Sequence, residues 1–220
     1  MKQATSNLGS GPALLFGIVL SVCLVFGGSV FANTLCFVNA LPRTEKVNLL
    51  YQGKKIRPIP FGEGEITACL KVPPGNLAFT VEDPGQGSLP MAAKVDAGQH
   101  KTLVVYEKII LDPKSAKETK KVSVLEIPKV GSPEGGKTRF RIAYVGGKEE
   151  LQLRVNDSPL RLAPDGFTDP LTGGLSVKVA DGAAGTEPRV FSFEGSQSFV
   201  LVIFYGYDGK LKMSVAYETL

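Results

Sequence analysis

Histidine, clustered aspartate and cysteine are the residue types in this sequence whose placement could support chemistry. The single histidine, His100, lies just before an expected core strand. Acetyl transfer by the serine route requires a base within hydrogen-bonding reach of a nucleophile. No G-x-S-x-G, G-D-S or S-x-x-K pattern accompanies the histidine. The sequence therefore favours a strand-edge or surface histidine over a catalytic base, and it predicts a protein that is not an enzyme.

Two aspartates, Asp165 and Asp169, lie close together in the segment DGFTD and could supply oxygen ligands to calcium. The ligand spacing of an EF-hand is missing, and clusters of Gly, Asp and Pro more commonly form turns. We therefore predict no metal and no other cofactor. The glycosylation sequon Asn156-Asp157-Ser158 overlaps an expected β-turn.

The first 32 residues have the pattern of a secretory signal peptide. Lys2 is followed by no charged residue until Arg43, the apolar stretch covers 13–26, and Val30-Phe31-Ala32 resembles a cleavage site. We expect cleavage after Ala32. The alternative is an uncleaved membrane anchor, since about 18–20 apolar residues can span a bilayer.

Two cysteines, Cys36 and Cys69, remain once Cys23 leaves with the signal. In an oxidising compartment two such cysteines pair by default, so we predict a Cys36–Cys69 disulfide. Both lie in the middle of expected strands, which could be neighbours in one sheet or face each other across a sandwich. The alternative is two separate buried thiols that act as small hydrophobic groups.

The elements that must position these residues have an all-β pattern. Fifteen prolines and twenty-five glycines separate short alternating runs, which is typical of β-sandwiches. The residues Pro73-Pro74-Gly75-Asn76 predict a hairpin-like turn within 66–81. The run 102–106 predicts a central strand that is either buried on both faces or part of a sandwich interior. The lysine-rich segment 112–121 is interpreted as a solvated connector, with a polyanion site as the alternative. Strands are expected near 34–39, 46–51, 65–72, 77–82, 91–96, 101–107 and 122–127.

The second half of the chain repeats the first. Residues 138–144 align with 34–40, and 151–155 with 47–51, at a shift of 104, which falls to 98 at the Gly173 and Gly75 turns. The counterpart of the 65–72 strand is expected to be absent or irregular. The sequence thus predicts two tandem Ig-like β-sandwich domains, 33–128 and 137–220, which follow the signal peptide 1–32 and are joined by a linker at 129–136. The formal charge of +4 is too small to indicate nucleic-acid binding.

A series of short motifs carries a resemblance to known proteins. The motifs are F-V-N-A-x-P, a V-x-L-x-Y strand, P-F-G, L-x-V-P-P-G-N and A-G-x-x-x-T-L-V. Their order resembles the periplasmic accessory proteins of alginate O-acetylation (the F component of that system) and a tandem bacterial extracytoplasmic domain of unknown function. The matching residues are Val38, Asn39, Ala40, Pro42, Pro73, Pro74, Gly75, Asn76, Leu103 and Val104.

The resemblance implies a periplasmic, non-enzymatic accessory protein that binds or scaffolds the exopolysaccharide-acetylation machinery. Its partners would be periplasmic or membrane acetylation proteins, polysaccharide, or both, with no nucleic acid and no membrane contact beyond the signal segment. The alternative is an exported or cell-surface scaffold or adhesion domain with no role in acetylation. Aromatic platforms for sugar could come from Tyr51, Tyr144, Tyr205 and Tyr207.

Overall fold

The computed structural model describes residues 33–67, 69–133, 135–147, 151–162, 164, 166–173, 175–180, 189–193 and 196–218. The predicted signal segment 1–32, with Cys23, lies outside the described residues, as do Asp165 and Gly174. All regular elements of the described part are strands, which confirms the all-β prediction. Among these residues no helix is long and apolar enough to cross a membrane.

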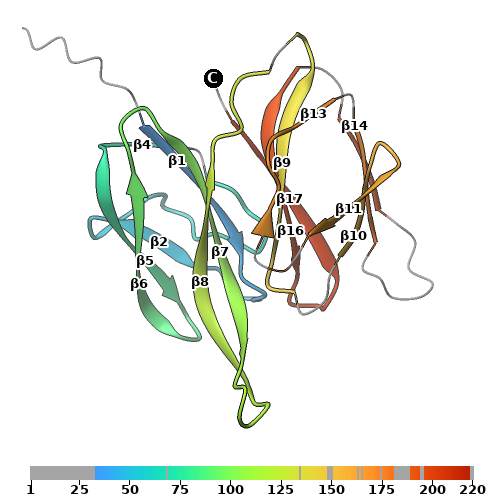
Figure 1. Ribbon diagram of the computed structural model, residues 1–220. Helices are drawn as coiled ribbons and strands as arrows, with labels where there is room; N and C mark the ends of the chain where they lie inside the picture. The colour runs from blue at the N-terminus through green and yellow to red at the C-terminus, as the bar shows by residue number, and fades with distance from the viewer. Residues whose placement is uncertain are drawn as a thin grey trace, which may run out of the picture. The chain divides into compact units, whose positions relative to one another are not determined.

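The first half of the chain forms two four-stranded sheets (Figure 1). Sheet 1 has the order β4-β1-β7-β8, from β1 (Asn33–Ala40), β4 (Leu70–Val72), β7 (His100–Leu111) and β8 (Glu118–Pro128). Sheet 2 has the order β3-β2-β5-β6, from β2 (Asn48–Tyr51), β3 (Lys54–Lys55), β5 (Gly75–Asp83) and β6 (Gly87–Val95). Alternate residues of both sheets form the first hydrophobic core, such as Phe37 of sheet 1 and Phe79 and Val81 of sheet 2.

The second half forms the remaining two sheets. Sheet 3 has the order β12-β9-β16-β17, from β9 (Thr138–Val145), β12 (Gly166–Phe167), β16 (Ser198–Tyr205) and β17 (Leu211–Tyr217), with β13 (Leu171–Gly173) also paired to β9. Sheet 4 has the order β11-β10-β14-β15, from β10 (Leu151–Val155), β11 (Ser158–Leu162), β14 (Leu175–Ala180) and β15 (Arg189–Phe193). Phe140, Leu153 and Leu201 belong to the core of this half.

A third hydrophobic cluster contains residues of both halves. Val38, Val104 and Tyr106 of sheet 1 are buried in one cluster with Val200 and Val202 of sheet 3. The alternate residues of β7, Leu103 and Val105, face the first core instead. The prediction that 102–106 is buried on both faces is therefore confirmed. All described residues belong to one compact unit, so the boundaries 33–128, 129–136 and 137–220 stay a prediction.

The strand register of the second half reproduces that of the first. The parallel pair β1–β7 places Phe37 opposite Leu103, and the parallel pair β9–β16 places Arg141 opposite Val200. The equivalent positions are 104 residues apart in β1 and β9 (37 and 141) and 97 residues apart in β7 and β16 (103 and 200). Positive φ angles also recur in the equivalent turns, at Gln52-Gly53 and Asn156-Asp157. The equivalent strands therefore pair in the same way in the two halves.

Two local predictions are wrong. The Pro73-Pro74 segment does not close a hairpin, because β4 pairs with β1 in sheet 1 whereas β5 belongs to sheet 2. Proline has no N–H to donate, so the chain leaves one ladder there and starts the next at Gly75. The strand expected at 65–72 is shortened to β4 and an isolated bridge at Ile66. Its counterpart in the second half is irregular, as expected, since β12 and β13 pair separately with β9.

The prediction that 112–121 is a solvated connector is also partly wrong. Only 112–117 forms a turn, and residues 118–121 continue β8, where they pair with the end of β7 from Lys108 to Leu111. The sequence pattern indicated a connector because this part has few large apolar residues. The ladder needs only backbone hydrogen bonds, and these do not depend on apolar side chains.

Candidate functional site

The predicted disulfide is present between Cys36 of β1 and Cys69, immediately before β4. The two Cα atoms are 4.2 Å apart, one step along the ladder from the Leu35–Leu70 pair. The cysteines are therefore neighbours in one sheet and do not face each other across the sandwich. The bond ties a three-residue edge strand to the central part of sheet 1.

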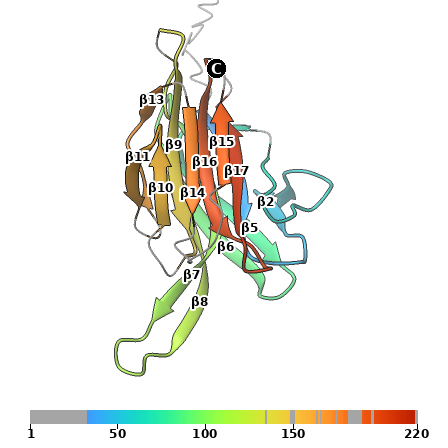
Figure 2. The ribbon, with the colours of Figure 1, turned by 90° about the vertical axis from the view of Figure 1, so that its right-hand side faces the viewer.

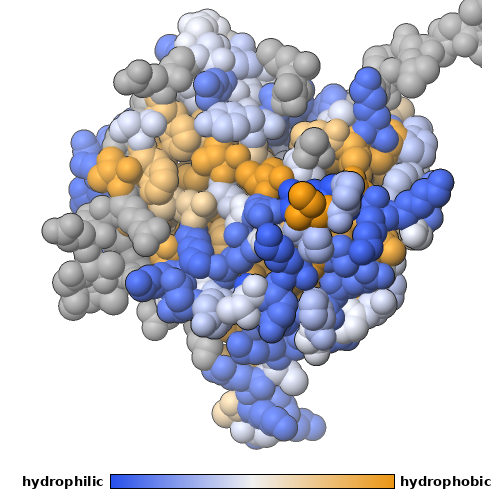
Figure 3. Space-filling model, turned by 180° about the vertical axis from the view of Figure 1, so that it is seen from behind, coloured by the Kyte–Doolittle hydropathy of each residue, from blue (hydrophilic) through white to orange (hydrophobic). Residues whose placement is uncertain are grey.

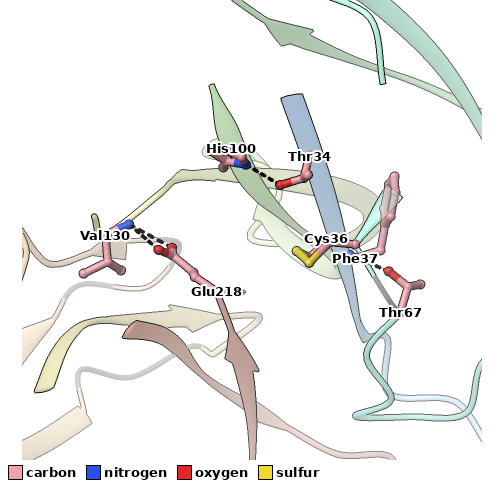
Figure 4. The surroundings of a disulfide bond; sticks show 8 residues. Thr34, Cys36, Phe37, Thr67, His100, Val130 and Glu218 are labelled. Atoms are coloured by element: carbon pink, nitrogen blue, oxygen red, sulfur yellow. Dashed lines mark hydrogen bonds between the residues drawn. A yellow bond between two sulfur atoms is a disulfide. The ribbon is translucent and has the colours of Figure 1, made fainter. Parts of the chain in front are cut away.

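His100 lies beside this disulfide, in a small polar cavity that Lys101, Lys129 and Glu218 also line. Burial, followed by the positive charge of Lys129, lowers the pKa of the imidazole. The Nδ1 atom of the ring and the hydroxyl of Thr34 form a hydrogen bond (Figure 4). The Thr34 hydroxyl and His100 thus join the start of β1 to the start of β7. His100 is therefore a half-buried residue at the start of β7.

Glu218, which directly follows β17, also lines this cavity and lies beside Val130 (Figure 4). Its two carboxylate oxygens lie 2.8 and 3.0 Å from the backbone nitrogen of Val130, which donates to them. Burial raises the pKa of this carboxyl group, although the Val130 N–H, Lys129 and Arg141 oppose the change. The contact fastens the end of the second half to residues 129–131, and the sequence contains no local signal for it.

Residues of the resemblance motifs hold a loop in place. The side-chain amide of Asn39 donates to the carbonyl oxygens of Phe61 (3.2 Å) and Gly62 (3.0 Å), and its oxygen accepts from the N–H of Leu41 (3.1 Å). Asn39 belongs to the F-V-N-A-x-P motif, whereas Phe61 and Gly62 belong to P-F-G. The two motifs therefore contact each other, and their polar groups are used to hold the chain.

The loop that Asn39 holds reaches the second half of the protein. A carboxylate oxygen of Glu63 accepts the N–H of Tyr207 at 2.6 Å, and Glu63 also forms an ion pair with Lys212. The hydroxyl of Ser214 donates to the carbonyl of Gly64 at 2.7 Å. Residues 63 and 64, which directly follow the P-F-G motif, therefore contact the second half of the protein.

A buried ion network lies where β7 and β8 leave the first core. Arg43 contacts Asp83 at 3.0 Å and Glu107 at 2.8 Å, and Lys120 contacts Glu107 at 2.9 Å. The Asp83 and Glu107 side chains are almost fully buried. Burial lowers the pKa of Arg43, but the hydrogen bonds and charges of the two carboxylates outweigh it, so the net shift is upward. The network keeps two buried carboxylates paired.

Beyond this network β7 and β8 continue as a two-stranded arm, defined here as residues 108–121. Figures 1 and 2 show the arm extending past the other strands, and Figure 3 shows that its surface is mostly hydrophilic. At its tip the Asp112 carboxylate accepts the Lys114 N–H at 2.8 Å and the Ser115 hydroxyl at 2.7 Å. Ile110 and Leu111 are exposed at 42% and 62%. The arm is therefore a formed hairpin whose side chains lie largely in solvent.

The four tyrosines proposed as sugar platforms do not form one surface. Tyr144 is fully buried, which excludes it from such a role, and its ring packs on Tyr205. Tyr51 is half-buried and stacks on Phe79 at a centroid distance of 5.1 Å. Only Tyr207 among the four is largely exposed, at 63%.

The candidate calcium residues are not brought into a site. Asp169 is exposed at a bend, and Asp165 lies outside the described residues. No group of three His, Cys, Asp or Glu side chains that could hold a metal ion occurs within the described ranges. The sequon residues Asn156 and Asp157 form the tight turn between β10 and β11, as predicted.

A functional assignment depends on the structural features described above, because comparison with known proteins adds none. The chain matches no protein-family model, and no curated protein was found to match it.

Proposed function

We propose that this protein is a non-enzymatic accessory protein of exopolysaccharide O-acetylation in the periplasm. In this role it binds the modifying proteins, the polymer, or both, as the resemblance to the alginate F component implies. The observation that carries the proposal is the arm, residues 108–121, which extends from sheet 1 and leaves Ile110, Leu111 and several lysines exposed. Exposed apolar and charged side chains on a formed hairpin suit a surface that contacts a partner.

The disulfide supports an extracytoplasmic location, because disulfides persist in oxidising compartments such as the bacterial periplasm. The proposed cleavage after Ala32 would leave Asn33 as the first residue of β1, and the chain from there onward contains the described strands.

The polar groups beside the disulfide support a structural role. His100 is engaged by Thr34, and both oxygens of Glu218 accept the N–H of Val130. Each contact joins segments that are far apart in the sequence. The proposal therefore assigns these groups to holding the fold.

Gene deletion followed by polymer analysis tests the function. Cells that lack the gene are expected to make normal amounts of polymer with a reduced acetyl content, and the wild-type gene should restore that content. Unchanged acetylation would reject the proposal and favour the alternative of an exported scaffold or adhesion domain.

An assay with purified protein tests the prediction that the protein has no catalytic activity. We expect no hydrolysis of an acetyl ester above the rate with buffer, and no difference between the wild type and His100→Ala. Turnover that disappears in His100→Ala would show that the protein is an enzyme.

A further inference from the structure

Several strands at the edges of the described sheets have features that prevent pairing with another chain. β3 and β4 are only two and three residues long, and β6 and β11 contain prolines, Pro90 and Pro159. Short edge strands and prolines both make a poor template for a further strand. β8, at the edge of sheet 1, has neither protection, because it is eleven residues long and its only proline, Pro128, is its last residue.

Hydrogen bonds at the two ends of the β7–β8 ladder determine which backbone groups of β8 point outward. The N–H of Lys129 donates to the carbonyl of His100 at 2.9 Å, and the N–H of Asp112 donates to the carbonyl of Lys117 at 3.0 Å. Hydrogen-bonded and non-hydrogen-bonded pairs alternate along an antiparallel ladder, so the odd-numbered residues of β8 bond to β7. The N–H and C=O groups of the even-numbered residues therefore point away from β7.

The outward backbone groups in the middle of β8 are available to a second strand. Within the described part of the chain, no backbone hydrogen bond joins Val122 or Val124 to a segment other than β7. The stretch 122–125 carries no charge, and Val122, Val124 and Leu125 are half-buried against the cores of the first half and the shared cluster. Valine at these positions also favours strand pairing.

The charged residues that flank this stretch are placed symmetrically about Ser123. Lys120 comes three residues before Ser123, and Glu126 comes three residues after it. If two copies of β8 pair antiparallel with Ser123 at the centre, Lys120 of each copy lies directly opposite Glu126 of the other. Opposite charges at such positions stabilise an antiparallel pair. Moving the centre of the pairing to either neighbouring residue loses this match of charges.

Both charged side chains have the exposure and the capacity to make this second contact. Lys120 is 58% exposed and contacts Glu107 at 2.9 Å, whereas Glu126 is 35% exposed and contacts Lys101 at 2.7 Å. A lysine ammonium group has three N–H donors and a carboxylate has two oxygens, so each can hold a further partner.

We propose that the outer edge of β8 is a dimerisation surface, on which β8 of a second copy of this chain pairs antiparallel about a two-fold axis at Ser123. Sheet 1 would then continue from one copy into the other. In such a contact the same surface is used on both copies, so it must be complementary to itself. The arrangement of Lys120 and Glu126 meets that requirement, and it favours a second copy over an unrelated strand.

A cysteine at the centre of the proposed pairing tests the register. Ser123 would face its own copy in a non-hydrogen-bonded pair, where the two Cα atoms are about 4.5 Å apart. This distance is within the range that a disulfide spans. Ser123→Cys should therefore form a covalent dimer on oxidation, seen by gel electrophoresis without reductant, and peptide mapping should locate the new bond at residue 123. The matched control is Ser88→Cys, at an exposed position of the edge strand β6, which should stay monomeric on the same gel.

Measurements on the purified wild type test the pairing without any substitution. We expect sedimentation velocity to show an equilibrium between monomer and dimer. Hydrogen exchange of the Val122 and Val124 amides should slow as the protein concentration rises, because these N–H groups are bonded only in the dimer. Ser123→Asp places two like charges together at the axis and should weaken the dimer at least about tenfold. Ser88→Asp, the control, should stay within about twofold of the wild type.

The possible contrary results separate different explanations. A wild type that is monomeric at every concentration, or equal cross-linking of Ser123→Cys and Ser88→Cys, would overturn the inference. A dimer that Ser123→Asp leaves intact would place the interface elsewhere on the molecule. Slow exchange of Val122 and Val124 in a monomer would show that a segment of the same chain covers the edge. None of these measurements depends on the proposed role in acetylation.

Discussion

At the residue scale the covalent bond between Cys36 and Cys69 has the largest expected effect on stability. The bond closes a sequence separation of 33 residues and secures β4, which has only three residues in its ladder. In the chain-entropy model, cross-linking a loop of this length raises the free energy of the unfolded chain by roughly 3–4 kcal/mol.

We therefore expect Cys36→Ser/Cys69→Ser to lose roughly 3–4 kcal/mol of unfolding free energy, measured by urea denaturation. Wild-type protein denatured under reducing conditions should show the same loss. A double variant as stable as the oxidised wild type would show that the bond does not stabilise the fold.

The carboxyl group of Glu218 gives a pH-dependent prediction. Burial raises its pKa in the folded protein above the usual value of 4.5, so the folded state binds a proton more tightly than the unfolded state. The stabilisation from this group is complete below pH 4.5 and is lost as the pH rises through the folded-state pKa. Glu218→Gln keeps a carbonyl oxygen for the Val130 N–H and has no charge to desolvate.

We expect Glu218→Gln to be at least as stable as the wild type at pH 7 and to lose this part of the pH dependence, measured by urea denaturation from pH 4 to 8. Glu45→Gln, at an exposed site, is the control and should follow the wild-type profile. A Glu218→Gln variant that is less stable than the wild type at pH 7 would contradict the argument, since it would show that the ionised carboxylate is favourable there.

The ion network below the arm contains a buried contact and a more exposed contact, so the stabilising effects of the two can be compared. Asp83→Ala removes a buried carboxylate that pairs with Arg43, and breaking such a pair costs about 3 kcal/mol. Lys120→Gln removes a side chain that is 58% exposed from the same network, so its cost should stay below about 1 kcal/mol. Chemical denaturation of the two variants measures the difference, and equal costs would show that burial does not determine the strength of these contacts.

At the element scale the sequence predicts strands better than it predicts their partners. Alternation in Val47, Leu49 and Tyr51 marks β2, and the apolar run at 102–106 marks a strand buried on both faces. Such patterns depend on local spacing. Whether β4 and β5 share a sheet depends on contacts with β1 and β2, and no local pattern in 66–81 carries that information.

The candidate site shows the same limit. The disulfide could be predicted because only two cysteines remain after the predicted signal segment 1–32. The contacts of Glu218 with Val130 and of Asn39 with Phe61 join residues 88 and 22 positions apart, and their partners include backbone atoms that every residue has. Sequence spacing could not single out these pairs. The composition of 112–121 predicts a charged and exposed segment, but it does not indicate that β7 and β8 continue into the arm.

Shortening the arm tests whether it contributes to the stability of the fold. A variant in which Asn-Gly replaces residues 110–119 keeps the Lys120–Glu107 contact and closes the hairpin with a favourable two-residue turn. The removed residues are all exposed, so the melting temperature should change by only a few degrees. A large fall in the melting temperature would show that the arm stabilises the fold.

At the scale of the whole molecule the two similar halves are joined by their sheets as well as by the linker. The register of β1–β7 recurs in β9–β16, so each half contributes an equivalent central pair of strands. Those pairs carry Val38 and Val104 in one half and Val200 and Val202 in the other, all of them fully buried in the shared cluster. Neither half could expose this face to water without losing the free energy of its burial.

We therefore expect the two halves to unfold in one cooperative transition. Hydrogen exchange of the amides in β1 and β16 should report equal opening free energies, because separating the halves exposes the shared cluster of both. Val202→Asp places an unpaired charge in that cluster and should lower both opening free energies by several kcal/mol, or prevent folding. Val190→Asp is the control, since Val190 is 54% exposed and lies outside the cluster, and it should change them by less than about 0.5 kcal/mol. The wild-type measurement alone can contradict this expectation, whether or not the variants fold. If the opening free energy of β16 is lower than that of β1, the halves are two independent domains with the predicted boundaries 33–128 and 137–220.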